Sequence, residues 1–476
     1  MFSKSAAGCV LFFSATINCL ADSPVTTPRP VPATRPEMKQ LLEDMKKRPP
    51  RIPLPELTEQ EKLQLGQRGS GYEARLRQLY VPAAEGTVFG PYRQPNTGGP
   101  ARATGPAADL TRNADGNMSL TYQFKTMLFW IVSRTNNCQY CLGHQEWKLS
   151  ATGMKDDAIA ALDSDWAEYS EAEQAAFAYA RMLTYEPQKL SDDSLAQIVR
   201  HYSPLQVLEM TMSVSGNNAI NRWKEGIGTP QSSGNTFAGR GEASPGGDSG
   251  HSDSFTTPTS DRFKREVSLV APLEILDGKA SGRGMNTRPV RESRSDVMLK
   301  LAEARQRTPR LPLTDEATAR AWLKEAGEDV PATNWIRLVA NFRNEGRGRL
   351  PSLLSRERKT GALSELQKGR LNWILARQDR AWYAVGLAYK QLRGLGQSDD
   401  EIFALDGDWQ GLSASDRALF TFANHLGASP IASTDDEAAA ALHATSAEIV
   451  VQTVNHVASC AYFNRVTEAA GLPIEP

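Results

Sequence analysis

Apolar side chains recur at helical spacing in the stretch that leads into a cysteine pair. Between positions 120 and 132 they lie three or four residues apart, as on one face of an α-helix. The same pattern, started by serine, aspartate or proline, predicts further helices over 38–47, 156–162, 170–183, 191–201 and 204–223. We find no convincing run of alternating apolar and polar residues, which would indicate a β-strand. The sequence therefore predicts an all-α fold.

Three segments without this periodicity separate the predicted helices. Residues 22–37 are rich in proline and threonine, and residues 80–117 are rich in glycine, proline and asparagine. We expect the first to be an extended or disordered linker and the second to be a long irregular loop. Residues 231–294 are dominated by glycine and serine, which predicts a flexible linker. An apolar island at 267–276 interrupts this linker and fits either a docking strand or no element.

The second half of the chain repeats the first. Residues 162–166 read LDSDW and residues 405–409 read LDGDW, so the offset is 405 − 162 = 243. At this offset, residues 134–230 match residues 377–473 without a gap, and about a third of the positions are identical, which indicates an internal duplication.

The duplication sets the predicted domain boundaries. A first helical domain over 38–230 is joined by the linker to a second over 295–476. The proline-rich start of each copy supports this division, because RTPRLPL at 307–313 echoes RPPRIPL at 48–54. The sequence thus predicts two tandem all-α domains.

The first copy carries a candidate reactive trio, Cys138, Cys141 and His144. An asparagine pair just before Cys138 is a plausible helix N-cap, which would place the two thiols and the imidazole on one broad helix face. A helix N-terminus and a neighbouring base lower the pKa of a thiol, and the second thiol can resolve an oxidised first one into a disulfide. These residues therefore predict thiol redox chemistry.

The second copy keeps the predicted helix without the reactive groups. Alanine stands at the positions that match the two cysteines, 381 and 384, and leucine stands at 387 in place of the histidine. The trio is therefore not needed for packing, which favours a functional dithiol over a structural disulfide. A zinc site lacks a fourth ligand nearby, and a c-type haem site would need histidine where Leu142 stands. We expect no metal and no cofactor.

The composition and the N-terminal sequence indicate in which compartment the chain is located and which classes of partner are not favoured. The net charge is −1, from 54 basic and 55 acidic residues, so nothing in it favours binding to nucleic acid or to anionic membranes. Residues 1–21 read as a secretory signal, and no other stretch reaches the length of a membrane span. We therefore expect an exported chain. Cleavage of this signal would leave three cysteines, Cys138, Cys141 and Cys460. Three cysteines do not form a disulfide framework.

A helix bearing CxYCxxH, followed by helices that end in an Asn-Arg pair before glycine and proline, resembles the carboxymuconolactone decarboxylase and AhpD-like alkylhydroperoxidase family. The resemblance covers about 120–230, and about 363–473 in degenerate form. It implies helical subunits assembled into trimers or hexamers, and a dithiol that reduces peroxides and is recharged by a dithiol or thioredoxin-like partner. It assigns Cys141 as the peroxide-reactive cysteine, Cys138 as its resolving partner and His144 as the proton-relay base.

Two positions depart from the family pattern. Gln145 stands where the family has its histidine, one residue after His144, and Thr126 stands where it has a relay glutamate. Two other functions remain open on the sequence alone. One is a lactone-processing lyase of the same fold, which would need a cationic pocket. The other is a non-catalytic helical scaffold with an inert cysteine pair.

Three further motifs favour structural roles. The aspartates of the two LDxDW motifs could form an acid–base pair, but the motif persists in the copy that lacks the cysteines, so a packed loop is preferred. We expect Arg222 and Arg465 of the Asn-Arg pairs to contact a helix end or another subunit. His456 and Cys460 lie four residues apart, and we interpret them as a buried cysteine beside a polar histidine rather than as an activated thiol.

Overall fold

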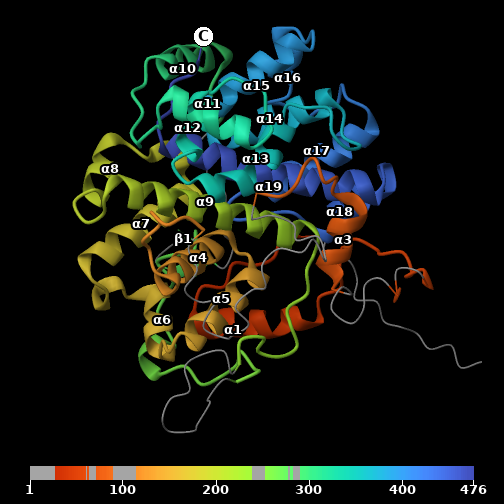
Figure 1. The fold of residues 1–476 in the computed structure, drawn as a ribbon. Coiled ribbons are helices and arrows are strands. Elements are labelled where there is room, and N and C mark those ends of the chain that lie inside the picture. The colour runs from red at the N-terminus through yellow and green to blue at the C-terminus, as the bar shows by residue number, and fades with distance from the viewer. Residues whose placement is uncertain are drawn as a thin grey trace, which may run out of the picture.

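The computed structural model describes residues 27–59, 62–63, 71–88, 114–238, 252–276, 279–281 and 290–475. The predicted signal 1–21 lies outside these residues. The described chain is helical apart from one short antiparallel hairpin, which confirms the all-α class (Figure 1).

The helices before residue 290 form the first half of the fold, together with the hairpin. They are α1 Arg35–Asp44, η1 Met45–Lys47, α3 Tyr72–Tyr80, α4 Tyr122–Asn136, α5 Gln139–Ala151, α6 Asp156–Ser164, η3 Trp166–Glu168, α7 Glu171–Tyr185, η4 Pro187–Lys189, α8 Asp192–Ile198, α9 Pro204–Gly226 and η5 Asp261–Phe263, followed by strands β1 Glu274–Leu276 and β2 Lys279–Ser281.

The second half contains only helices among its described residues. They are α10 Arg294–Arg305, α11 Glu316–Glu325, α12 Asn334–Val339, α13 Arg343–Ser355, α14 Glu365–Asp379, α15 Trp382–Gly394, α16 Asp399–Ala404, α17 Ala414–Gly427, α18 Asp435–Ala444 and α19 Ala447–Ala469. Helices α4 to α9 begin 243 residues before α14 to α19, one for one, so the helix starts repeat at the spacing of the sequence.

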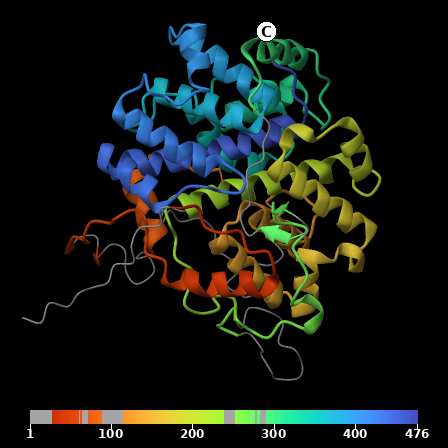
Figure 2. The same cartoon turned by 180° about the vertical axis from the view of Figure 1, so that it is seen from behind.

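Helices α9 and α19 run side by side through the middle of the molecule. Helices α4 to α6 lie on one side of this pair and α14 to α16 on the other, while α3 packs on α19 (Figures 1 and 2). The two backbones approach closely at Gly226, where an added Cβ would meet Val454 Cγ1 at 2.6 Å. Buried apolar side chains of both halves form one continuous cluster around this pair.

Polar contacts between the halves come in matched pairs, as in a two-fold dimer. Arg222 of α9 donates to the carbonyl of Gly427 at 3.2 Å, and Arg465 of α19 donates to the carbonyl of Thr184 at 2.9 Å. Both carbonyls lie at the matching helix end, 243 residues apart. This confirms the expectation that these arginines contact a helix end. An isologous surface of this kind is what two identical copies use to pair.

A second matched pair lies at the edge of the same interface. Arg51 pairs with Asp435 at 2.6 Å, and Arg310 pairs with Asp192 at 2.6 Å. Each ion pair joins the proline-rich start of one half to the first turn of a helix in the other. The interface is therefore built twice by the same kinds of residue.

Residues 27–37, part of the segment expected to be a linker, pack against the first half. Val31 is buried, and Arg134 donates to the carbonyl of Pro32 at 2.8 Å. Helix α1 begins at Arg35, three residues before the predicted start, because the Glu37 carboxylate accepts the backbone N–H of Thr34 at 3.0 Å. Tertiary contacts thus order a stretch whose composition indicates an irregular chain.

Residues 231–238 and 252–271 pack on the first half, contrary to the flexible linker expected there, whereas Glu292 pairs with Arg377 of the second half. Phe255 stacks on Trp147 with ring centres 4.4 Å apart, and the Ser268 amide donates to the carbonyl of Ala33 at 2.9 Å. The apolar island predicted at 267–276 is therefore a docking segment, paired with Thr34 through a single bridge at Val267. The few aromatic and apolar side chains of the 231–294 segment make these contacts. The glycine- and serine-rich composition of the segment as a whole does not reveal them.

Candidate functional site

The candidate site lies where α4 ends and α5 begins. Asn137 ends α4 in the left-handed conformation, with φ at 57°, and Cys138 is the N-cap of α5. The predicted cap is therefore wrong by one residue: Cys138 occupies the cap itself and not the first helical turn. Asparagine tolerates this conformation, and the Asn137 side chain donates to the carbonyls of Arg29 and Pro30.

The two thiols are neighbours and both are buried. Cys138 is fully buried, Cys141 is 2% exposed, and neither is in a disulfide. Burial, a hydrogen bond to Cys141 and the charges of Cys141 and Glu225 raise the pKa of Cys138 well above its ordinary value. This contradicts, for Cys138, the lowered pKa expected at a helix N-terminus, because loss of solvation outweighs the helix dipole.

Two lysines act on Cys141. The ammonium groups of Lys148 and Lys224 both interact electrostatically with it. Burial lowers the pKa of Lys148 to about 8, so this side chain can exchange a proton near neutral pH. Lys224 stays cationic, because an ion pair with Glu73 outweighs the effect of burial and raises its pKa.

His144 lies in an aromatic setting beside the thiols. Its ring stacks on Tyr140, with centres 4.8 Å apart, and meets the edge of Phe237 at 5.3 Å. Burial, followed by the charges of Lys148 and Lys224, lowers the pKa of His144 to about 3. The imidazole is therefore neutral at physiological pH and a poor proton acceptor, which favours Lys148 as the group that exchanges protons.

The segment after α9 covers this helix. Gln231 donates to the carbonyl of Tyr140 at 3.2 Å. A Cβ added at Gly143 would lie 2.0 Å from the Gln231 amide nitrogen and 2.9 Å from Phe255. Glycine is thus required at 143 because the covering side chains rest on the backbone of α5, and their contact helps to keep the thiols from solvent.

The lysines, unlike the cysteines, were not identified from sequence. Glutamine 391 and threonine 467 occupy the matching positions in the second copy, whereas Tyr140 is kept as Tyr383. Lys148 and Lys224 are thus lost together with the cysteines. The gap-free register between the copies contained this signal, although many other positions also differ.

The first aspartate of each LDxDW motif, Asp163 or Asp406, has a structural role. Asp163 accepts two hydrogen bonds from the buried Arg134, at 3.0 and 3.2 Å. In the second copy Asp406 accepts one from Arg377 at 3.0 Å. The motif tryptophans each donate to the leucine carbonyl that begins the motif, at 2.9 and 2.8 Å. These contacts fit the packed-loop interpretation and leave no acid–base pair free.

His456 and Cys460 share one partner. The His456 ring and the Cys460 thiol both contact the Asn372 side-chain oxygen, at 3.0 and 3.2 Å, and both residues are buried. Burial raises the pKa of Cys460. This is the arrangement of a packed polar cluster and not of an activated thiol.

The residues that the structure describes contain neither a metal-ligand cluster nor a membrane-spanning helix. No cluster of three or more histidine, cysteine, aspartate or glutamate residues there could hold a metal ion. No helix in those ranges is both long and apolar enough to cross a bilayer. No family model and no curated protein matches the chain.

Proposed function

We propose that the chain is an exported, thiol-dependent peroxide reductase of the AhpD-like type, in which Cys138 and Cys141 cycle between dithiol and disulfide. The observation that supports the proposal is the pair of buried thiols at the start of α5, not joined in a disulfide, with Lys148 and Lys224 interacting electrostatically with Cys141. A cation stabilises the thiolate, which is the nucleophilic form. The second copy, which lacks both thiols, serves as a structural partner in this proposal.

The proposed reaction has three steps. The Cys141 thiolate attacks the outer oxygen of a hydroperoxide, the O–O bond breaks, and the alkoxide takes a proton from the Lys148 ammonium. This leaves Cys141 as a sulfenic acid. The Cys138 thiol then attacks the Cys141 sulfur, and the departing hydroxide leaves with the Cys138 proton as water. An external dithiol, or a thioredoxin-like protein, reduces the resulting disulfide and is itself oxidised to a disulfide. The Cys141 thiol then passes its proton to the neutral Lys148 amine, which restores the starting state.

Burial of the thiols favours a small substrate. A hydroperoxide can reach a buried thiolate through a small opening, whereas a protein disulfide needs an exposed sulfur. The high pKa of Cys138 also fits a resolving role, because a resolving thiol need not be ionised before the first step. Recharging by a large partner would require the covering segment around Gln231 and Phe255 to move.

The decisive experiment measures consumption of cumene hydroperoxide with dithiothreitol as the donor. The double variant Cys138→Ala/Cys141→Ala should lose this activity. It should also fold, because the second copy carries alanine at both matching positions, 381 and 384. Full activity in the double variant, with an unchanged helical circular dichroism spectrum, contradicts the proposal.

The pH dependence provides a second prediction. The rate of the wild type should fall as pH rises through about 8, because Lys148 then loses the proton it donates. Lys148→Gln, which introduces the residue that stands at the matching position of the second copy, should be slow at every pH. Its rate should not fall as pH rises through about 8. Lys300→Gln, which changes an exposed lysine on α10 of the second copy, serves as the matched control. A wild-type rate that keeps rising beyond pH 9 would exclude Lys148 as the donor.

A non-catalytic scaffold is the second candidate, and the burial of both cysteines favours it. Titration of the native chain with a thiol reagent after mild reduction separates the two proposals. A redox-active pair reacts before the chain unfolds. An inert pair reacts only in denaturant.

A further inference from the structure

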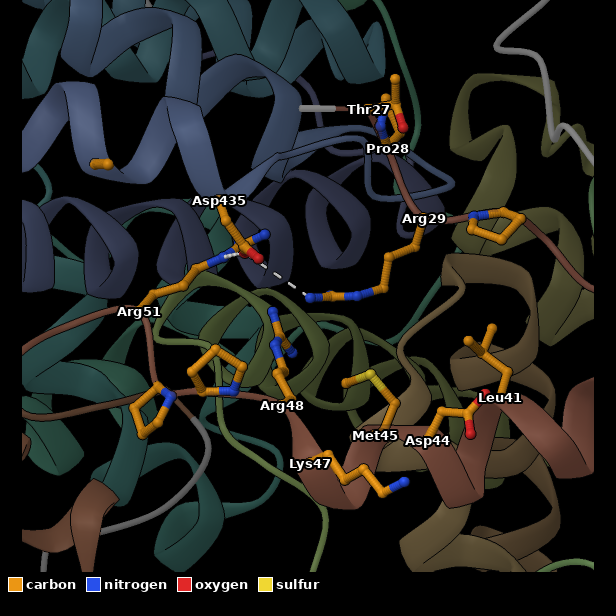
Figure 3. A pocket seen from close by; sticks show the side chains of 14 residues that line it. Thr27, Pro28, Arg29, Leu41, Asp44, Met45, Lys47, Arg48, Arg51 and Asp435 are labelled. Atoms are coloured by element: carbon orange, nitrogen blue, oxygen red, sulfur yellow. Dashed lines mark hydrogen bonds and ion pairs between the residues drawn. The ribbon is translucent and has the colours of Figure 1, made fainter. Parts of the chain in front are cut away.

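A cleft of about 590 Å³ opens at the edge of the interface between the two halves. Residues 27–30 form one wall, the end of α1 and the prolines after it form a second, and Asp435 and Ala439 of α18 close it from the other half (Figure 3). Ligand sites commonly occupy clefts of this size where structural units meet.

Three arginines converge in this cleft. Arg29 pairs with Glu225 at 2.9 Å and approaches Asp435 at 3.8 Å, and Arg48 pairs with the same Glu225 at 2.9 Å. Arg51 pairs with Asp435, and the three guanidinium groups face a shared space (Figure 3). Two carboxylates therefore serve three buried or nearly buried cations. Lys47 and Asp44 at the rim cancel each other, so one positive charge is uncompensated.

The three arginines differ in how many of their N–H donors already have a hydrogen-bond partner. Arg51 is committed, since it donates to Glu225, Ser433 and Asp435. Arg48 is 7% exposed, and its Nε has no hydrogen-bond partner among the residues that the structure describes. Burial and the charge of Arg48 lower the pKa of Arg29 to about 10, so each cation raises the energy of its neighbour. An added anion would relieve this repulsion and satisfy the free donor.

The remaining wall of the cleft is apolar. It consists of Leu41, Met45, Ala439 and the prolines that flank Arg29 and Arg51. A small inorganic anion would leave this surface unused, whereas a hydrocarbon body would bury it. The chemistry of the site therefore has two parts, a guanidinium cluster and an apolar lining.

We propose that this cleft binds a monocarboxylate with an apolar body, its carboxylate held by Arg29 and Arg48 and its hydrocarbon part packed on Leu41, Met45 and Ala439. The carboxylate accepts from the arginine donors that face the cleft. Glu225 keeps its ion pairs and supports the arginines from behind. The cleft neighbours the thiols, because Glu225 also acts on Cys138 and Asn137 donates to the carbonyls of Arg29 and Pro30, but carboxylate binding does not rest on the redox chemistry proposed above.

The test is isothermal titration of the full chain with decanoate, with decan-1-ol as the neutral analogue. Decanoate should bind, and decanol should bind at least about tenfold more weakly, because charge-assisted hydrogen bonds are lost. Arg29→Gln should weaken decanoate binding by a similar factor, and Ala439→Trp should block the apolar wall. Ala439 is exposed, so this substitution tests the cleft without disturbing the core. The mirror variant Arg310→Gln, which removes the matching ion pair outside the cleft, should bind like the wild type.

Each alternative result overturns the proposal. Equal binding of decanol means an apolar cleft without anion recognition. Unchanged decanoate binding in Arg29→Gln and Ala439→Trp places the ligand elsewhere. Displacement of decanoate by inorganic phosphate at equal concentration indicates a simple anion site, and no heat with either ligand indicates no site. Repeating the titration with Cys138→Ala/Cys141→Ala keeps this outcome separate from the redox proposal.

Discussion

Replacing Cys141 with serine should reduce peroxide turnover on the order of 10³-fold or more, because the proposed nucleophile is removed. Lys148 and Lys224 both act on Cys141, and a serine hydroxyl at that position would not ionise at neutral pH. The measurement is steady-state consumption of cumene hydroperoxide with dithiothreitol. Cys460→Ser is the matched control, and its rate should stay within about twofold of the wild type, since Cys460 lies in a separate buried cluster.

The other cysteine should give a different defect. Cys138→Ser should still consume one equivalent of peroxide and then stop, because the sulfenic acid at Cys141 has no resolving thiol. Trapping with dimedone and mass spectrometry would locate the adduct on the peptide that contains Cys141. An adduct on Cys138 in the reciprocal variant would reverse the assigned roles. Equal turnover in both single variants would exclude the dithiol mechanism.

Arg465→Ala should lower the free energy of unfolding by about 3–5 kcal/mol, because it leaves a buried carboxylate without its cation. Arg465 is fully buried, pairs with Asp379 at 3.2 Å, and also donates across the interface to the carbonyl of Thr184. Urea denaturation followed by circular dichroism measures the change. Loss of this arginine should weaken the contact between the two halves as well as the second copy itself.

Two controls bracket this effect. Arg294→Ala removes exposed ion pairs to Asp399 and Asp400 and should cost far less stability than Arg465→Ala, because solvent screens exposed charges. Asp379→Asn introduces the residue found at the matching position 136 and should cost less than Arg465→Ala, because an amide can still accept from arginine. A cost for Arg465→Ala as small as that for Arg294→Ala would mean that the buried pair does not hold the interface.

The matched interface gives the second copy a physical reason to persist. Arg222 and Arg465 each reach the helix end of the opposite half, and helices α9 and α19 bury one another. The first copy would expose this whole surface if the second were absent. The second copy, which lacks the thiols, therefore still covers an apolar face that the first copy cannot leave in water.

The sequence by itself determined the helices of the first copy, the repeat and the position of the cysteine pair. Helical periodicity and capping residues are local, so α4 to α9 follow from short stretches of chain, and the repeat extends them to α14 to α19. The 243-residue register was likewise readable, because duplicated scaffolds keep the residues that pack. The buried roles of Asp163 and Arg222 were consistent with their survival in both copies.

Only the tertiary structure decided the state of the site. Cys138 has a raised pKa and His144 a lowered one because both are buried, and burial depends on segments far away in the chain. Gln231 and Phe255 come from a stretch whose composition indicates a flexible linker, yet they cover α5. Lys224 lies about eighty residues from the thiols in sequence but acts directly on Cys141. Local patterns cannot encode such contacts, because charge and solvation are set by whatever the fold brings together.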